Sequence, residues 1–295
     1  MTATRVFMVD VLAAHVSAPE TMLEESVTEF AGSQSTLTVD DLAASRGDGV
    51  FETLAVVDGR VQASEAHLDR LVRSAELLDL ARPHRAQWRY ALDRAARAVP
   101  AGRTGVLKLV LSRGREGSPR PTGWIAVSSA PSAVPERRTG VRVVTLDRGV
   151  SSTAASESPW LLLGAKSLSY ATNMAALREA ARRGAQDVIY TSTDGYVLEG
   201  PTSSVLARIG GRIVTPAVEA GVLPGTTQHD AFVALDAERV ETAAEPVPVS
   251  ALAEADAIWL ASSVRLLVPV VALDGRPVPQ DAELTDRINA VLLAR

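Results

Sequence analysis

Apolar residues recur at two different spacings in the first half of the chain, and each spacing predicts a different element. Two apolar segments, 50–57 and 60–63, are predicted to be strands, and Asp58-Gly59 between them is a strong signal for a tight hairpin turn. Ser64 is predicted to be the N-cap of a helix, whose apolar face consists of Leu68, Leu71, Val72, Ala75 and Leu78. The pattern also predicts a helix at 85–99 and strands at 105–112 and 123–128.

Short apolar runs separated by glycine-containing turns dominate the second half of the chain. The run at 160–163 predicts a buried strand, after which Met174, Leu177 and Ala181 recur at helical spacing until Gly184 ends the helix. Further strands are predicted at 141–146, 188–191, 196–198, 205–209, 212–215, 258–263 and 267–273. The segment 223–228 is predicted to enter a helix that runs through Leu235, and a last helix is predicted at 281–293. In the first 44 residues, the pattern predicts only a strand at 5–11.

A stretch without periodic apolar residues separates the two halves. It is rich in small polar residues and proline, carries two arginines and predicts a linker at 131–140. Since 295 residues suffice for two modest cores, we expect a smaller domain at 1–130 and a larger domain at 141–295.

Composition excludes several classes of function. The formal net charge of −5 argues against a nucleic-acid surface, so small molecules are the expected partners. The absence of cysteine excludes disulfides and thiolate chemistry, and four scattered histidines argue against a metal site. We predict a cytoplasmic protein, because neither a clean signal peptide nor an apolar run long enough to span a membrane is found.

Lys166 is the most informative single residue. It stands where the predicted strand at 160–163 gives way to a helix. Because burying an ammonium is costly, a lysine at the end of a core strand must be paired, lose its proton or be used covalently. Covalent use of the amine is what carbonyl and pyridoxal chemistry needs.

Other polar residues would suit an anionic ligand. His67 and Arg70 are three residues apart on a predicted helix and can jointly hold an anion, although a solvated face is the default for a single arginine. Glu199 ends a predicted hairpin and precedes the hydroxyl-rich segment 200–204. Small residues in the segment 223–228, which enters a predicted helix, favour an anion site at the helix N-terminus, and the alternative is an ordinary helix start with a threonine cap.

A lysine, a carboxylate and a phosphate anchor are together what pyridoxal 5′-phosphate requires. Its aldehyde bonds the lysine, a carboxylate keeps its pyridinium nitrogen protonated, and its phosphate needs backbone N–H groups and a cation. The residues above therefore predict this cofactor.

The sequence also resembles a known family, the fold-type IV pyridoxal-phosphate enzymes, which include branched-chain aminotransferases, D-amino-acid aminotransferases and aminodeoxychorismate lyases. The resemblance covers residues 45–273 and follows the family's order through GDGVFET, EAHLDRL, KSLSYATNMAALREA, DGYVLEGPTSSV, LPGTTQ and WLASSVRLLVPV. It implies a two-domain α/β fold, with a smaller N-terminal domain and a larger one of mixed sheets and flanking helices. It further implies a cofactor in the cleft between the domains and a homodimer.

The resemblance also implies roles for individual residues. Lys166 would form the Schiff base with the cofactor and move the proton, and Glu199 would pair with the pyridine nitrogen. Tyr170 would contact the ring hydroxyl. Phosphate would be held by Arg70, by the backbone at Thr226 and Thr227 and by the Ser263 hydroxyl. The full set of expected cofactor-binding residues is Arg70, Lys166, Tyr170, Glu199, Thr202, Ser203, Thr226, Thr227 and Ser263.

Substrate-side residues favour one member of this family. The strand at 105–112 is similar to that of aminodeoxychorismate lyases, and Lys108 and Arg113 could pair with the carboxylates of a dianionic substrate. D-Amino-acid aminotransferases carry an Arg-x-His pair and a tyrosine after Gly-Asp-Gly. This chain has Arg120-Pro121-Thr122 and Phe51 instead.

These features predict a lyase that eliminates pyruvate from 4-amino-4-deoxychorismate and leaves 4-aminobenzoate for folate synthesis. The alternative is a transaminase for D-amino or branched-chain amino acids, which the same cofactor site would serve. A non-catalytic binding protein would have no reason to keep Lys166. A nicotinamide-dependent oxidoreductase lacks its glycine fingerprint here.

Overall fold

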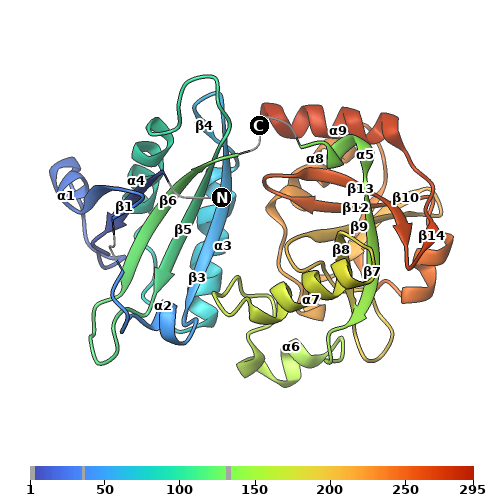
Figure 1. Cartoon of the computed structure of the whole chain (residues 1–295), viewed down its shortest axis with the longest axis horizontal. Helices are drawn as coiled ribbons and strands as arrows, with labels where there is room; N and C mark the ends of the chain where they lie inside the picture. The colour runs from blue at the N-terminus through green and yellow to red at the C-terminus, as the bar shows by residue number, and fades with distance from the viewer. Residues whose placement is uncertain (1–3, 35–36, 131–133) are drawn as a thin grey trace. The chain divides into compact units, whose positions relative to one another are not determined.

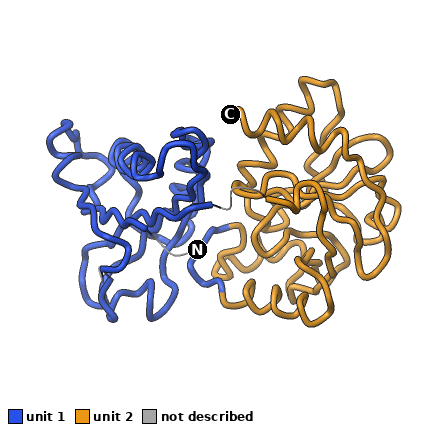
Figure 2. Tube along the Cα trace, turned by 45° about the horizontal axis from the view of Figure 1, so that its top comes forward, with its two compact units in different colours: residues 1–132, 165–170 blue, residues 133–164, 171–295 orange. Residues whose placement is uncertain are grey.

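The computed structural model describes residues 4–34, 37–130 and 134–295, which fold into two compact units (Figures 1 and 2). Unit 1 consists of Met1–Ser132 and Ala165–Tyr170, and unit 2 of Ala133–Gly164 and Ala171–Arg295. The chain thus crosses between the units on both sides of the short segment that carries Lys166. Each unit has its own sheet and its own helices.

Unit 1 is built on a six-stranded antiparallel sheet with the order β2-β1-β6-β5-β3-β4. Its strands are β1 (Arg5–Val9), β2 (Val27–Ala31), β3 (Gly49–Val57), β4 (Arg60–Val61), β5 (Gly105–Ser112) and β6 (Thr122–Ser129). Two long helices, α3 (Ser64–Leu77) and α4 (Arg85–Arg97), pack against this sheet, and α1 (Glu20–Glu25) and α2 (Leu42–Ser45) are short. The predicted strand at 5–11 is therefore confirmed as far as Val9.

The hairpin predicted around Asp58-Gly59 is confirmed. Both residues have positive φ angles, 49° and 76°, as the two central residues of a tight hairpin turn require. The prediction of Ser64 as a helix cap is wrong. Ala63 occupies the N-cap position with a left-handed φ of 49°, and Ser64 is the first residue of α3. The apolar face predicted for this helix is buried, from Leu68 to Leu78.

Unit 2 is built on an eight-stranded mixed sheet with the order β11-β10-β9-β12-β13-β7-β8, and β14 pairs with β13. Its strands are β7 (Val141–Asp147), β8 (Asp187–Thr191), β9 (Ser204–Ile209), β10 (Arg212–Pro216), β11 (Thr242–Glu245), β12 (Ala257–Ser262), β13 (Leu266–Leu273) and β14 (Arg276–Pro277). Separate apolar clusters fill the two faces, with α8 (Thr226–Ala237) and α9 (Ala282–Ala294) over one and α7 (Ala171–Arg182) against β7 and β8. The remaining helical turns are α5 (Glu136–Thr139), α6 (Ala154–Glu157), η1 (Pro159–Leu161), η2 (Val218–Ala220) and η3 (Val249–Glu254).

The prediction of a strand at 160–163 is wrong. Pro159–Leu161 form a single 3-10 turn, Leu162 has a left-handed φ of 54°, and the Trp160 side chain is 73% exposed. Proline at the start of this turn donates no backbone hydrogen bond, and Gly164 follows with a positive φ. The run is apolar, but its backbone turns and cannot enter a sheet.

The buried face of α7 also differs from the prediction. Ala176 and Ala180 are buried against β7 and β8, whereas Met174 is 45% exposed and Ala181 is exposed. The helical period was identified correctly, but two small alanines rather than the larger Met174 face the sheet. Gly184 follows the helix with a φ of 77°, in line with its predicted role as the stop.

The predicted linker at 131–140 contains an element that its composition did not indicate. Residues 131–133 lie outside the described part of the chain, and Glu136–Thr139 form α5, after which Gly140 has a φ of 67°.

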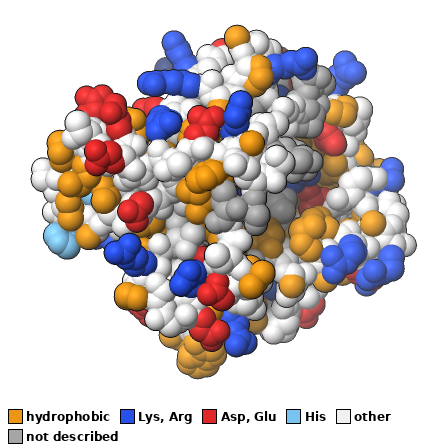
Figure 3. Space-filling model, turned by 60° about the vertical axis from the view of Figure 1, so that its left-hand side comes forward, with side chains coloured by type: hydrophobic (Ala, Val, Ile, Leu, Met, Phe, Trp, Pro, Cys, Tyr) orange, Lys and Arg blue, Asp and Glu red, His pale blue; other side chains and the backbone are white. Residues whose placement is uncertain are grey.

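On the face shown in Figure 3, basic and acidic side chains lie interspersed among apolar ones. Within the described residues, no helix is long and apolar enough to cross a membrane.

Candidate active site

Lys166 is held against the edge of β3 in unit 1. Its carbonyl accepts the N–H of Phe51 at 2.9 Å, and its own N–H donates to the Ser74 hydroxyl of α3 at 3.1 Å. One step further, Leu168 donates to the carbonyl of Gly49 at 2.8 Å. Strand β4 pairs only with the C-terminal end of β3. The segment that carries Lys166 therefore lies along the part of β3 that would otherwise be an edge of the sheet.

Gly49 permits this close approach. A Cβ atom there would lie 2.8 Å from the Leu111 carbonyl oxygen and 2.8 Å from the Leu168 side chain, which is closer than Cβ atoms come in real proteins. Gly49 is therefore needed for the close packing of β3 against β5 and against Leu168, rather than for a phosphate-binding loop.

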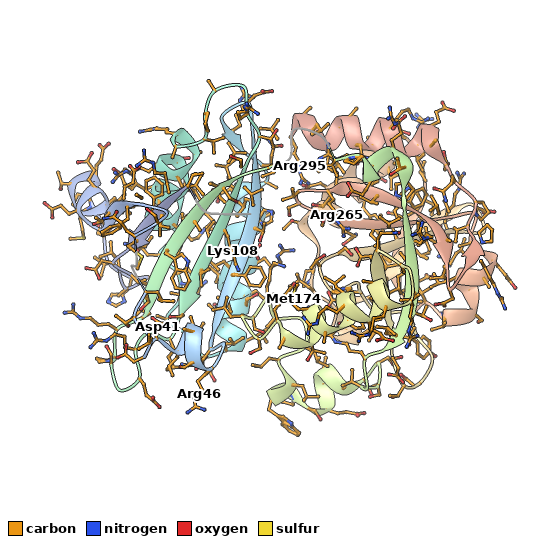
Figure 4. All side chains as sticks on the ribbon, viewed as in Figure 1. Asp41, Arg46, Lys108, Met174, Arg265 and Arg295 are labelled. Atoms are coloured by element: carbon orange, nitrogen blue, oxygen red, sulfur yellow. The ribbon has the colours of Figure 1, made fainter. Side chains whose placement is uncertain are left out.

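Both lysines of the chain lie against the ring of Phe51. The Lys166 Nζ is 4.7 Å and the Lys108 Nζ 4.8 Å from the ring centroid, within the range of cation–π attraction. Tyr170 packs edge-on against the same ring, with a centroid separation of 5.1 Å and an interplanar angle of 80°. Figure 4 labels Lys108 on β5, where it pairs in register with Thr53 of β3. Lys108 is exposed by surface area, and the partial desolvation of its ammonium by the neighbouring groups lowers its pKa.

A buried charge cluster lies where β3 meets α3. The Glu52 carboxylate accepts from Arg70 Nε at 2.8 Å and from Arg70 NH2 at 2.7 Å, and it lies 2.7 Å from Nδ1 of His67. Burial alone would raise the pKa of Glu52, but the charge and hydrogen bonds of Arg70, together with those of His67, hold it well below its usual range. His67 and Arg70 jointly bind an anion, as their spacing predicts, and this anion is the carboxylate of Glu52.

Acid should destabilise the protein through this cluster. Burial lowers the pKa of His67, so below about pH 6.5 the unfolded chain takes up a proton that the folded chain refuses. The depressed pKa of Glu52 acts in the same direction as the pH falls below about 4.3, the usual glutamate value. We expect the urea midpoint to be nearly constant above pH 7 and to fall between pH 7 and 5. In His67→Gln this decline should be smaller, and equal declines in the two proteins would contradict the assignment.

Glu199 is fixed in unit 2 by two donors. The Leu223 N–H donates to one carboxylate oxygen at 3.0 Å and Arg148 to the other at 3.1 Å. The guanidinium of Arg148 also lies 5.6 Å from the ring centroid of Tyr190, whose N–H donates to the Glu199 carbonyl. The Glu199 side chain keeps 16% of its surface exposed, so it is held rigidly and remains accessible to a ligand.

The hydroxyl-rich segment after Glu199 contains one buried polar group that lacks a partner. Among the described residues, the Ser203 hydroxyl has no hydrogen-bond partner although it is buried. Thr202 is exposed, and the carbonyl of Pro201 accepts from Asn173 at 2.8 Å. Because buried hydroxyls normally have a hydrogen-bond partner, Ser203 is a candidate ligand-binding group.

Helix α8 begins without a side-chain cap. Gly225 is the N-cap and has no side chain that could accept from the first-turn N–H groups, so the alternative of a threonine cap is wrong. Thr226 and Thr227 are buried in that first turn. A Cβ atom at Gly225 would lie only 2.2 Å from the Ser204 hydroxyl, so β9 and the helix start are in close contact. The positive end of the helix dipole and the backbone N–H groups of the first turn fit a phosphate ester.

Two further predicted residues lie in turns. Ser263 lies in the turn between β12 and β13, where Arg137 donates to the carbonyls of Val264 and Arg265 at 2.8 Å and 2.9 Å. Arg113 pairs with Asp48 at 2.7 Å and donates to two backbone carbonyls of the turn after α3. This engagement weighs against Arg113 as a ligand for a substrate carboxylate.

Comparison with known proteins places the chain in a family. Residues 49–273 match the family model described as amino-transferase class IV. The chain belongs to the class IV aminotransferase family. It is 46% identical, over 85% of its length and 92% of the relative's, to the bifunctional aminodeoxychorismate lyase / D-amino acid transaminase of Mycobacterium tuberculosis.

Solved structures agree with this membership. A fold IV transaminase from Curtobacterium pusillum is 45% identical with a TM-score of 0.92, covering 99% of this chain and 98% of that one. An aminotransferase from Mycobacterium tuberculosis with bound α-ketoglutarate and PMP is 41% identical with a TM-score of 0.88, covering 97% and 99%. The predicted fold class and the predicted cofactor, pyridoxal 5′-phosphate, are confirmed.

Sequence reasoning missed several residues that organise the site. Glu52 carried a signal, because a lone carboxylate inside the apolar strand VFETLAVV indicates a buried ion pair. No sequence pattern indicates Arg148 or Ser74, because their partners Glu199 and Lys166 are 51 and 92 residues away along the chain.

Proposed function

We propose that this pyridoxal-phosphate enzyme is a transaminase whose favoured substrates are D-amino acids. The observation that carries the proposal is the placement of Lys166 and Lys108 over one aromatic ring in unit 1. An α-amino acid bears its carboxylate on the carbon that reacts. A second cation close to the reactive amine therefore suits that substrate class.

When bound, the cofactor supplies an aldehyde that bonds amines and a pyridinium ring that accepts the electron pair released when the Cα–H bond breaks. Lys166 would bond the aldehyde and, once the substrate amine replaces it, take the proton from the substrate Cα. Lys108 would pair with the substrate carboxylate. The buried ring of Phe51 lies against both ammonium groups, and Lys108 also stays exposed to solvent.

The other predicted residues would orient the cofactor. Glu199 would hold the proton of the pyridine nitrogen, and the Leu223 N–H and Arg148 keep the carboxylate in place for that role. Tyr170 would form a hydrogen bond with the hydroxyl group of the cofactor ring. The phosphate would be held by Arg70, Ser203, Thr226, Thr227 and Ser263, with Thr202 at the exposed side of the same segment.

Preference for D-amino acids is supported by the relatives. The Mycobacterium tuberculosis protein is named both a lyase and a D-amino acid transaminase, and D-alanine aminotransferase of Bacillus licheniformis is 25% identical over 88% of this chain. Phe51 offers no hydroxyl to a substrate, so we assign carboxylate binding to Lys108.

Aminodeoxychorismate lyase is the second candidate. It is favoured by the lysine in β5 and by the lyase activity in the name of the 46% identical relative. It is weakened by Arg113, which Asp48 already neutralises and which would be the second cation for a dianionic substrate. The same Lys166 would remove the proton from the amine-bearing carbon in either reaction.

A paired assay on the cofactor-loaded protein tests the proposal. One arm follows keto-acid formation from D-alanine, with L-leucine as the matched donor and 2-oxoglutarate as acceptor. The other follows release of 4-aminobenzoate from aminodeoxychorismate. We expect turnover of D-alanine well above that of L-leucine. Release of 4-aminobenzoate without keto-acid turnover would replace the proposal by the lyase, and preference for L-leucine would contradict the substrate class.

A further inference from the structure

Arg295, which follows α9, reaches the first turn of α8 in the same unit. Figure 4 labels Arg295 at the C-terminal end of α9. Its guanidinium donates to the Thr227 hydroxyl at 3.3 Å and to the carboxylate of Asp230 one helical turn further on. The Arg295 side chain is only 13% exposed, so these contacts are shielded from solvent.

The Thr227 hydroxyl is left with a proton to donate. Its oxygen accepts from Arg295, and a guanidinium accepts no hydrogen bond in return. Thr227 is buried, and within the described residues its hydroxyl donates to no protein acceptor. The Nε–H of Arg295 is likewise buried and has no partner in that part of the chain.

Two unused buried donors, the Thr227 hydroxyl and the Arg295 Nε–H, thus accompany the first turn of α8, whose N-cap is Gly225. Buried donors without an acceptor at the start of a helix are the complement of an anion. Asp230 neutralises the charge of Arg295, so the arginine changes the local field little. Its effect on an anion comes from the direction it imposes on the Thr227 hydroxyl.

We propose that Arg295 is a positioning residue for the phosphate of the cofactor, because it fixes the Thr227 hydroxyl as a donor at the N-terminus of α8. This inference rests on the proposed function, which takes the cofactor's phosphate as the anion at that helix. It adds a residue from the last helix of the chain to the control of cofactor affinity.

Cofactor affinity with and without the phosphate tests the inference. The apoprotein is titrated with pyridoxal 5′-phosphate and with pyridoxal, and binding is followed by the change in absorbance. In Arg295→Gln, the Kd for pyridoxal 5′-phosphate should rise about 5- to 10-fold, the loss typical of one hydrogen bond, and the Kd for pyridoxal should not change. In a Thr227→Val background, the arginine substitution should have no further effect.

Arg287→Gln is the matched control. Arg287 lies on α9, the helix that Arg295 follows, and pairs with Glu238 at the C-terminal end of α8, so its loss removes a comparable ion pair far from the N-terminus of α8. This variant should bind both ligands like the wild type. Arg295→Lys should recover part of the affinity for pyridoxal 5′-phosphate, and it decides the question if Arg295→Gln does not fold.

Three results would overturn the inference. These are an unchanged Kd for pyridoxal 5′-phosphate in Arg295→Gln, an equal rise for both ligands, or a full additional loss in the Thr227→Val background. Failure of the proposed placement of the phosphate looks different, because the wild-type protein would then bind pyridoxal 5′-phosphate no better than pyridoxal. Failure of the proposed transaminase activity would leave cofactor binding intact and would be seen in the paired assay.

Discussion

Lys166→Ala should lower the rate of transamination at least about 10³-fold, because it removes both the amine that bonds the cofactor and the base that moves the substrate proton. The fold should survive, since the hydrogen bonds that hold this segment to β3 and to Ser74 are made by its backbone. Turnover of D-alanine with 2-oxoglutarate measures the loss. Circular dichroism and the thermal midpoint check that the variant is folded.

The small number of lysines makes the covalent role of Lys166 unusually easy to verify. Lys108 and Lys166 are the only lysines in the sequence, so a cofactor fixed by borohydride reduction has two possible side-chain positions. We expect the modification on the peptide that contains Lys166 and none in Lys166→Ala. Lys108→Ala is the matched control. It should retain the modification and raise the KM for the amino acid, because Lys108 is assigned to the substrate carboxylate. Modification of Lys108 in the wild-type protein would exchange the two roles.

Glu52→Gln should lower the free energy of unfolding by about 3–5 kcal/mol, the loss seen when one partner of a buried ion pair is removed. Arg70 is only 8% exposed and would keep a buried charge without its counter-ion. An amide retains the shape of the carboxylate, so lost charge rather than lost volume accounts for the change. Urea denaturation at pH 7.5, followed by circular dichroism, measures it.

Glu65→Gln is the matched control for this prediction. Glu65 also binds two cations, Arg85 and Arg89, but its side chain is 50% exposed. Ion pairs in such surroundings contribute at most about 1 kcal/mol. Similar losses in the two variants would mean that Glu52 acts as a surface charge, in conflict with its burial. Cofactor binding should also weaken in Glu52→Gln, because Arg70 would no longer be held by two hydrogen bonds.

Local patterns predicted those elements whose stability is local. The Asp58-Gly59 hairpin, the strand that contains Lys108 and the helix from Ser64 to Leu77 all form as expected, because turn chemistry and the apolar period specify them directly. The apolar run at 160–163 misled, because hydrophobicity alone does not distinguish a strand from a turn between Pro159 and Gly164. The residue roles inferred from the family resemblance are predictions that the experiments above test.

The sequence by itself determined most of the elements, their order and the cofactor class, and it predicts Lys166 as the reactive residue, since these depend on residue type and on local spacing. Only the tertiary structure showed that Lys166 joins the edge of β3, that Lys108 and Lys166 share the ring of Phe51, and that Glu52 neutralises Arg70. Arg295 reaches Thr227 across 68 positions of sequence. Such contacts depend on strand register and helix packing, which bring together residues that no short-range pattern relates.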